Sequence, residues 1–241
     1  MLKTVICIAR LIFDLMCINI KFEKVKRLAK ENKIAEHDKL VSIYVKDWAK
    51  SVLKVAGVTV SASGLSNIPT DETVLFVCNH QSFFDIPVLL SSLDKPYGLL
   101  SKDEVKKIPF ITKCMIELNC VFINRENPRS AVKSLALVGD KLDKGYSMII
   151  FPEGTRTKTG EVGKFKHGAF KLAISKKVSV VPIALDGTFD VFEGNNHIFK
   201  PNNVKLEVLP KIPVSDDTDY KVITHEAFDV ISKCVAKMRQ N

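Results

Sequence analysis

The chain has 241 residues, a mass of 26.9 kDa and a formal net charge of +9, which favours an anionic partner such as a phosphorylated substrate, an anionic lipid or a nucleic acid. Its 46% hydrophobic and 26% charged residues are ordinary for a globular protein and exclude a disordered or collagen-like chain. The six cysteines form no C-x-x-C pair and lie at no zinc-ligand spacing from a histidine, which argues against a metal site and a disulfide framework.

The first 20 residues form an apolar stretch for which a signal peptide, a membrane span and an amphipathic helix are the alternatives. Lys3, Arg10 and Asp14 interrupt the stretch, and no small-residue cleavage site follows it. In a helix these three residues and Lys21 fall on one narrow stripe, with a wide apolar face opposite. Arg10 and Asp14 are also spaced to form an i,i+4 ion pair.

A basic segment continues from the apolar stretch, over residues 21–33. The first 33 residues carry eight Lys and Arg against three Asp and Glu. This pairing predicts a helix that lies in the interface of an anionic membrane, on its cytoplasmic face, with lysines reaching the lipid phosphates. The alternatives are a helix packed on the protein's own core with a solvated charged face, and a single membrane span.

The remaining chain reads as a second helix followed by one α/β domain. Apolar residues recur at helical spacing over residues 37–56, and Gly57 follows as a stop signal. Short apolar runs then alternate with helical patterns, which is typical of a largely parallel mixed sheet flanked by helices. We expect strands at 58–60, 74–78, 97–100, 121–123, 147–151, 178–185 and 204–209, and helices at 86–93, 108–118, 128–144, 166–176 and 220–238. The chain is therefore divided into a helical membrane-associating segment, residues 1–56, and an α/β domain, residues 57–241.

A histidine and an aspartate follow the predicted strand 74–78. Ligands of α/β sheets bind beyond the carboxyl ends of the strands, which is where His80 lies. One helical turn can bring the Asp85 carboxylate back to the imidazole, where it would fix the tautomer and stabilise the imidazolium. The structural alternative is a capping box of Ser82 and Asp85, in which Asp85 only starts a helix.

Two further strand ends carry arginines. The strand 147–151 leads into residues 152–156, where Gly154 lets the backbone approach a ligand and Arg156 offers a planar fork for a phosphate. Arg125 follows the strand 121–123. The alternative is a charged turn with an incidental pair of Glu153 and Arg156. Together with His80, the three strand ends predict one anion-binding site that contains a base.

These blocks, in this order, resemble the lysophosphatidic acid acyltransferase family, the 1-acylglycerol-3-phosphate O-acyltransferases. Asn79-His80-Gln81-Ser82-Phe83-Phe84-Asp85 is similar to the family's NHxSxxD block, and Phe151-Pro152-Glu153-Gly154-Thr155-Arg156 matches its FPEGTR block residue for residue. Phe122-Ile123-Asn124-Arg125 and Val181-Pro182-Ile183-Ala184 resemble its second and fourth blocks, so that the resemblance covers about residues 52–185. The second block commonly opens with glycine, where this chain has Asn119-Cys120, and this departure leaves the shape of the acceptor or acyl pocket open.

The resemblance implies transfer of a fatty acyl group from an acyl thioester, either acyl-CoA or acyl-carrier protein, to the sn-2 hydroxyl of lysophosphatidate, giving phosphatidic acid in phospholipid biosynthesis. It implies that His80 is the general base and Asp85 its orienting partner. Direct attack on the thioester requires no protein nucleophile, no metal and no bound cofactor. The implied phosphate-binding residues are Arg125, Glu153, Gly154, Thr155 and Arg156, with Lys102 as a candidate oxyanion or donor contact and Pro182 in the acyl pocket.

Two other functions compete with this hypothesis. A related acyltransferase would use the same motifs on glycerol 3-phosphate or another lysophospholipid. A non-enzymatic protein that binds an anionic membrane or a nucleic acid would account for the charge alone. Because no helix-turn-helix, aromatic stacking platform or zinc finger is visible, we expect no nucleic-acid partner.

Overall fold

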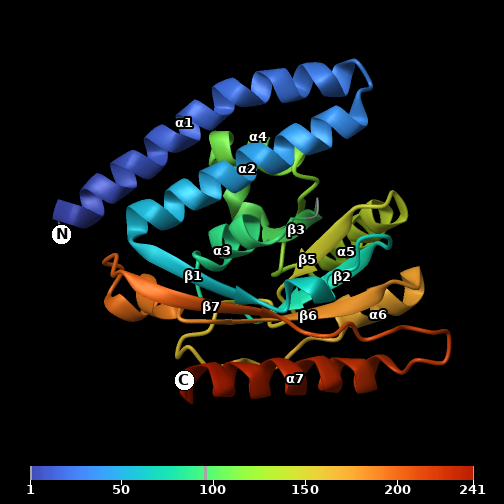
Figure 1. The fold of residues 1–241 in the computed structure, drawn as a ribbon. Helices are drawn as coiled ribbons and strands as arrows, with labels where there is room; N and C mark the ends of the chain where they lie inside the picture. The colour runs from blue at the N-terminus through green and yellow to red at the C-terminus, as the bar shows by residue number, and fades with distance from the viewer. Residues whose placement is uncertain (1, 95–96, 241) are drawn as a thin grey trace.

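A central sheet with helices on both faces organises the protein (Figure 1), in a computed structural model that describes residues 2–94 and 97–240. The strands are β1 (Val58–Ser63), β2 (Val74–Cys78), β3 (Tyr97–Lys102), β4 (Val121–Ile123), β5 (Ser147–Ile150), β6 (Ser179–Asp186) and β7 (Asn202–Val208). The α-helices are α1 (Leu2–Lys30), α2 (Ile34–Ala56), α3 (Asp85–Ser92), α4 (Pro109–Glu117), α5 (Pro128–Asp143), α6 (Gly168–Lys176) and α7 (Tyr220–Gln240).

The strand order in the sheet is β1-β7-β6-β2-β5-β3-β4. The five strands from β6 to β4 run parallel, whereas β7 is antiparallel to β6 and β1 is parallel to β7. The predicted mixed, largely parallel α/β sheet is therefore confirmed. Because the five strands share one direction, the loops after β2, β4, β5 and β6 all lie at the same edge of the sheet.

Both faces of the sheet are covered, and each has its own hydrophobic core. One core packs residues of α1, α2 and α3 against the sheet, and the other packs residues of α5, α6 and α7 against the opposite face. All five residues of β2 are buried, because this strand lies near the middle of the sheet. The loop that follows β2 therefore starts from one of the most firmly held parts of the molecule.

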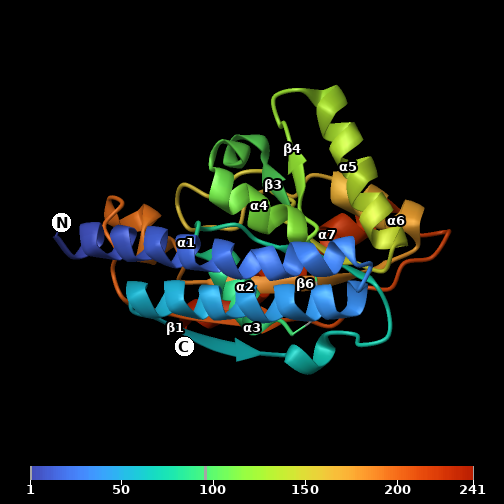
Figure 2. The same cartoon turned by 90° about the horizontal axis from the view of Figure 1, so that it is seen from above.

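The first two helices form an antiparallel hairpin whose members lie side by side across one face of the molecule (Figure 2). The basic segment continues α1 instead of ending it, so the helix runs unbroken to Lys30. Its second half buries Ile18, Phe22 and Val25 in the core, next to α2 and α4. This half corresponds to the alternative of a helix packed on the protein's own core.

The part of α1 up to Ile20 also has an apolar face that is exposed. The apolar side chains on this face are between 52% and 76% exposed; they are Val5, Ile12, Phe13, Met16 and Ile20. The expected pair of Arg10 and Asp14 is present at 2.9 Å, but Asp14 also accepts a hydrogen bond from Ser51 of α2 at 2.6 Å. Asp14 thus faces α2, whereas Arg10 of the same stripe is 56% exposed. Among the helices of the described residues, none has an apolar stretch long enough to cross a membrane.

Candidate active site

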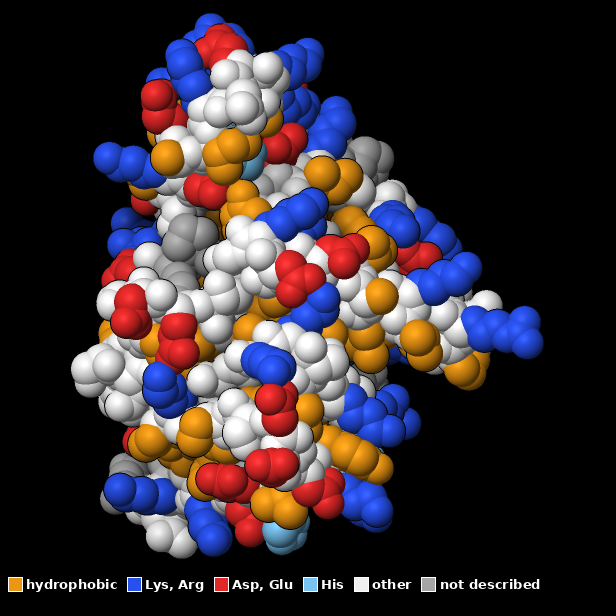
Figure 3. All heavy atoms as spheres, turned by 90° about the vertical axis from the view of Figure 1, so that its right-hand side faces the viewer, with side chains coloured by type: hydrophobic (Ala, Val, Ile, Leu, Met, Phe, Trp, Pro, Cys, Tyr) orange, Lys and Arg blue, Asp and Glu red, His pale blue; other side chains and the backbone are white. Residues whose placement is uncertain are grey.

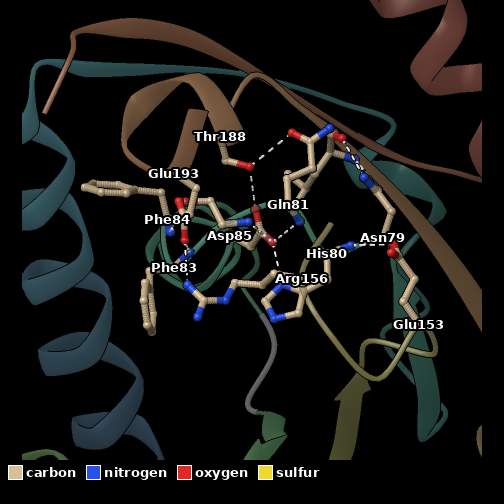
Figure 4. Close-up of polar contacts among 12 residues, drawn as sticks. Asn79, His80, Gln81, Phe83, Phe84, Asp85, Glu153, Arg156, Thr188 and Glu193 are labelled. Atoms are coloured by element: carbon tan, nitrogen blue, oxygen red, sulfur yellow. Dashed lines mark hydrogen bonds and ion pairs between the residues drawn. The ribbon is translucent and has the colours of Figure 1, made fainter. Parts of the chain in front are cut away.

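The loop between β2 and α3 brings His80 and Asp85 together. His80 Nδ1 lies 2.7 Å from Asp85 Oδ2 (Figure 4). The imidazole also stacks on Phe151, at the end of β5, with 4.0 Å between ring centroids and 19° between ring planes. An ionised carboxylate only accepts, so Nδ1 carries the proton and Nε2 is the basic nitrogen. This is the tautomer that a general base requires.

The Asp85 carboxylate is fully buried and is held by hydrogen-bond donors on both oxygens. Oδ2 accepts from the backbone N–H groups of Gln81, at 2.7 Å, and Ser82, at 3.0 Å, in addition to His80. Oδ1 accepts from the hydroxyl of Thr188 at 2.5 Å. The contact with the Ser82 N–H is one half of the capping box considered above. The other half of the box is not formed, because α3 begins at Asp85 with Phe84 at its N-cap position and without a side-chain cap. The Asp85 carboxylate therefore holds the loop before α3 and orients His80.

Glu153 supports the loop from the other side. Its carboxylate accepts from the backbone N–H of His80 at 2.8 Å and from the N–H of Gly163 at 3.1 Å. Burial raises the pKa of Glu153, and the two N–H donors oppose this by favouring the charged form. Gly163 must be glycine for this contact, since a Cβ there would lie 2.7 Å from Glu153 Oε2. Both oxygens of Glu153 thus accept from backbone N–H groups, so that Glu153 has a structural role here and stabilises the loop that carries His80.

The carboxylate that holds Arg156 is Glu193, in the 3-10 helix Glu193–Asn195 after β6. Arg156 Nη1 donates to Glu193 Oε1 at 2.6 Å, and the guanidinium carbon lies 3.7 Å from the centroid of the Phe83 ring. Glu193 also accepts from the Ser82 hydroxyl and, at 3.0 Å, from the Phe83 N–H. The FPEGTR turn is therefore tied to the His80 loop through a residue outside both motifs. Arg156 is 35% exposed, so its remaining N–H groups are open to a ligand.

Arg125 and Lys166 lie around Gly154. Arg125 Nη1 donates to the Gly154 carbonyl, and a Cβ on Gly154 would lie 2.7 Å from Lys166 Nζ. Gly154 has a φ of +74°, a left-handed conformation that favours glycine. The pKa of Arg125 is lowered, first by burial and also by the nearby charge of Arg156. The turn thus gathers three cationic side chains, Arg125, Arg156 and Lys166, an arrangement that favours an anionic ligand.

Three further residues are predicted for the site: Lys102, Thr155 and Pro182. Lys102, at the end of β3, is half-exposed and pairs with Glu104 at 2.6 Å. Thr155 is exposed in the turn after Gly154. Pro182 is buried within β6, next to Val77 of β2.

The departure at Asn119-Cys120 lies at a turn between α4 and β4. Asn119 has a φ of +59°, the left-handed conformation that glycine favours and asparagine tolerates. Its N–H donates to the Ile116 carbonyl at 3.0 Å, closing the end of α4. Asparagine therefore replaces glycine here in a helix-ending turn, and its side chain accepts from Lys141 at 2.7 Å.

Sequence reasoning missed Thr188 and Glu193, the two contacts that enter from beyond β6. Neither belongs to a motif, and they lie 103 and 111 residues after their partners Asp85 and Ser82. Lys166 is a third residue that the sequence motifs do not assign to the turn at Gly154. Among the described residues, no group of three or more His, Cys, Asp and Glu side chains is arranged to hold a metal ion.

Comparison with known proteins assigns the family. The acyltransferase family model matches residues 59–186, more than half of the chain. The chain belongs to the acyltransferase family. A relative named 1-acyl-sn-glycerol-3-phosphate acyltransferase, from Borreliella burgdorferi, is 30% identical over 183 residues, which cover 76% of this acyltransferase and 73% of that protein.

Two further comparisons are with a longer relative and with a solved structure of similar length. The chloroplastic 1-acyl-sn-glycerol-3-phosphate acyltransferase LPAT1 of Arabidopsis thaliana is 42% identical over 149 residues, which cover 61% of this chain but only 42% of that protein. The crystal structure of the 1-acyl-sn-glycerophosphate (LPA) acyltransferase PlsC of Thermotoga maritima superposes with a TM-score of 0.78 at 24% identity, covering 98% of both chains. The two proteins share a fold over their whole length.

Proposed function

We propose that this acyltransferase transfers a fatty acyl group from an acyl thioester to the sn-2 hydroxyl of 1-acylglycerol-3-phosphate, giving phosphatidic acid. The observation that carries the proposal is the 2.7 Å contact of His80 and Asp85, which lies one loop away from the cationic turn at Gly154. A base beside an anion site fits an acceptor that carries both a hydroxyl and a phosphate. The names of the Borreliella and Arabidopsis relatives support this choice of acceptor.

In the proposed reaction, His80 Nε2 takes the proton of the sn-2 hydroxyl while its oxygen attacks the thioester carbonyl carbon. The resulting imidazolium is stabilised by Asp85, which is held at 2.7 Å and fully buried. When the tetrahedral intermediate collapses, the C–S bond breaks and the leaving thiolate takes the proton back from His80. The carbonyl oxygen needs a donor while it is negative, and Lys102 remains the candidate for this contact or for one with the acyl donor.

The acceptor phosphate would be held by the turn after β5. Arg156 offers a planar fork on the His80 side, because its neighbour Thr157 donates its N–H to the His80 carbonyl at 2.9 Å. Arg125 and Lys166 approach Gly154 from other directions. The phosphate-binding set proposed from sequence is therefore extended by Lys166, while Glu153 contributes by holding the loop.

No bound cofactor or metal is needed for the proposed reaction, because the thioester already carries the activation energy. The donor is either acyl-CoA or an acyl-carrier protein thioester, and Pro182 of β6 is the residue we propose for the acyl pocket. Direct transfer gives no role to the cysteines as nucleophiles. Burial raises the pKa of Cys120 to about 12 and places the pKa of Cys78 well above its ordinary value.

We propose that the protein acts as a peripheral enzyme on the cytoplasmic face of an anionic membrane, with the exposed face of α1 in the interface. Two observations support this. The apolar face around Phe13 and Met16 stays uncovered, which is costly in water but favourable among lipid chains. In Figure 3, Lys and Arg side chains gather at the upper end, over the turn between α1 and α2, and acidic side chains gather at the lower end, where α7 begins.

This charge distribution would orient the molecule with the hairpin toward anionic headgroups. Arg27, Lys30 and Lys33 are exposed at the hairpin turn, whereas Asp216, Asp217, Asp219 and Glu226 are exposed near the start of α7. In Figure 1 the N-terminus of α1 and the C-terminus of α7 lie on the same side of the molecule. A lysolipid in the bilayer could then reach the enzyme without crossing water.

The proposal is tested with the purified full chain and an acceptor panel. Lysophosphatidate, glycerol 3-phosphate and a lysophospholipid with a capped phosphate are each incubated with an acyl-CoA and with an acyl-carrier protein thioester. We expect phosphatidate from lysophosphatidate with at least one donor, read by mass spectrometry. Faster acylation of glycerol 3-phosphate or of the capped lysophospholipid would mean that this compound, and not lysophosphatidate, is the preferred acceptor.

A further inference from the structure

The oxygen of Asp85 that does not face His80 is bound by a residue of a different segment. Thr188 lies just after β6, and its side chain is fully buried. Its Oγ1 is 2.5 Å from Asp85 Oδ1 and 3.2 Å from Gln81 Oε1. A hydroxyl has one proton, and the shorter contact is the one to the carboxylate, so Thr188 donates to Asp85.

The Gln81 side chain is held with its amide oxygen toward Thr188. Gln81 is 1% exposed, and its Nε2 lies 3.1 Å from both the Gly160 carbonyl and Asp186 Oδ1. Both of these atoms are acceptors, so the amide can only be oriented with its nitrogen toward them. Its oxygen must then face Thr188 as a second acceptor, and the single hydroxyl proton goes to the nearer and charged Asp85 Oδ1.

The last helix fixes this arrangement from outside. Arg239, near the end of α7, donates from Nε to Asp186 Oδ1 at 2.9 Å and from Nη2 to the Gly160 carbonyl at 2.6 Å. A third N–H group binds Glu161 at 2.5 Å. One guanidinium therefore holds both acceptors that orient Gln81, and Gln81 is linked to the dyad by its backbone N–H, which donates to Asp85 Oδ2 at 2.7 Å.

We propose that Thr188 is a positioning residue of the His80–Asp85 dyad through the hydrogen bond that its hydroxyl donates to Asp85 Oδ1, and this inference rests on the proposed function for its kinetic readout. Without the hydroxyl, the charged Oδ1 of Asp85 would be buried without a hydrogen-bond donor. Rotation of the carboxylate away from His80 would then be favoured, because it would bring Oδ1 toward other donors. A rotated carboxylate would hold the imidazole less firmly in the Nδ1–H tautomer. Since Thr188 contacts neither Arg156 nor Arg125, substrate binding should stay the same.

The test compares Thr188→Val, which keeps the shape but loses the hydroxyl, with Thr188→Ser, which keeps the hydroxyl. We expect Thr188→Val to lower kcat by about 10- to 100-fold, the range for losing a hydrogen bond to a charged group, with KM for lysophosphatidate changed less than about twofold. Thr188→Ser should keep kcat within about threefold of the wild type. The matched control is Thr224→Val, which removes another buried hydroxyl, one that donates to the Tyr220 carbonyl at 2.6 Å on α7.

A second measurement does not depend on activity. Long-range proton–nitrogen NMR spectra of the histidine-labelled protein report the tautomer of His80, assigned with a His80→Gln variant. We expect the Nδ1–H tautomer in the wild type, Thr188→Ser and Thr224→Val, and a mixture with the Nε2–H tautomer in Thr188→Val. The inference is overturned if Thr188→Val keeps the wild-type tautomer, or if Thr188→Ser or Thr224→Val loses as much kcat as Thr188→Val. If the wild type acylates no lysophosphatidate, the proposed function fails while the tautomer comparison alone decides the role of Thr188.

Discussion

Glu193 holds the guanidinium of Arg156 at 2.6 Å, across a separation of 37 residues, while the same carboxylate binds the N–H of Phe83. The arginine of the FPEGTR turn is thereby placed against the loop that carries His80, with the Phe83 ring beneath it. The pairing occupies part of the guanidinium fork and leaves the rest available. The separation between His80, the proposed base, and Arg156, in the proposed phosphate site, thus depends on a residue that neither motif contains.

Replacement of Arg156 should weaken acceptor binding. Arg156→Ala should raise KM for lysophosphatidate by about tenfold or more, since a hydrogen-bonded guanidinium–phosphate contact stabilises binding by about 1.5–3 kcal/mol. KM for the thioester should stay the same, and Arg156→Lys should recover only part of the loss because an ammonium cannot bind Glu193 and the phosphate in one plane. Arg129→Ala, an exposed arginine of α5, is the control. Equal increases in both KM values would mean that Arg156 mainly maintains the fold of the turn.

Replacement of the dyad should act on turnover. His80→Ala should lower kcat by about a thousandfold and leave lysophosphatidate binding nearly unchanged, because a base acts mainly in the transition state. Asp85→Asn should lower kcat by more than about tenfold but less than His80→Ala, since the amide oxygen can still accept from the loop N–H groups of Gln81 and Ser82. Steady-state kinetics with thermal unfolding of each variant check this. Near-normal turnover by His80→Ala would show that His80 is not the general base.

The exposed face of α1 should carry the membrane contact. Substituting Phe13 and Met16 together by serine should release the protein from anionic vesicles in a co-sedimentation assay, because these side chains are 58% and 52% exposed. Turnover should fall steeply on lysolipid in bilayers and little on a short-chain monomeric acceptor. Val132→Ser, at an exposed apolar residue of α5, is the matched control and should bind vesicles like the wild type.

Salt and deletion separate the alternatives for this helix. High salt should weaken vesicle binding only in part, since it screens the lysines but leaves the apolar face buried. Complete release by salt would contradict the interfacial arrangement, and so would attachment that resists carbonate. Deletion of the first 33 residues is a poor test, because it also removes the fully buried Phe22 and Val25 from the core and should destabilise the fold.

His37 should make stability depend on pH. Burial alone would lower its pKa, but hydrogen bonds to Glu117 of α4 and Asp38 outweigh this, so the pKa in the folded state lies above the ordinary 6.5. Protonated His37 therefore stabilises the fold fully below that ordinary value, and this contribution is lost as pH rises through the folded-state pKa. His37→Gln should lower the free energy of unfolding most at about pH 5.5 and least above about pH 8.

Chemical unfolding at several pH values checks this, with His225→Gln as the control. His225 is 78% exposed on α7 and should show little difference at any pH. If the loss of unfolding free energy caused by His37→Gln grew as pH rises, it would contradict the proposed pairing of His37 with the two carboxylates.

The sheet and its helices could be predicted from sequence because their apolar patterns are local. All seven expected strands and the five helices of the α/β part are confirmed. The pairing of His80 and Asp85 could also be predicted, since it spans a single loop. Which part of the apolar face of α1 would pack could not be predicted, because this face is wide and only the positions of α2 and α4 decide which part is covered.

The remaining contacts of the site depend on how the chain returns to the same edge of the sheet. Thr188 and Glu193 reach the loop because β6 lies next to β2 and ends beside it. Asn79 illustrates how close the two segments are: its side-chain amide pairs with both the N–H and the carbonyl of Leu185, at 2.8 Å each. No spacing rule in the sequence signals such contacts, since ordinary Thr and Glu residues make them.

The most direct test of the proposed function measures both products of one reaction. Purified wild-type protein is mixed with lysophosphatidate and an acyl thioester, and released thiol and newly formed phosphatidate are quantified together. Direct transfer with His80 as base predicts that the two products appear in a one-to-one ratio and that His80→Ala abolishes both. Thiol release without phosphatidate, or phosphatidate formation that persists in His80→Ala, would contradict it.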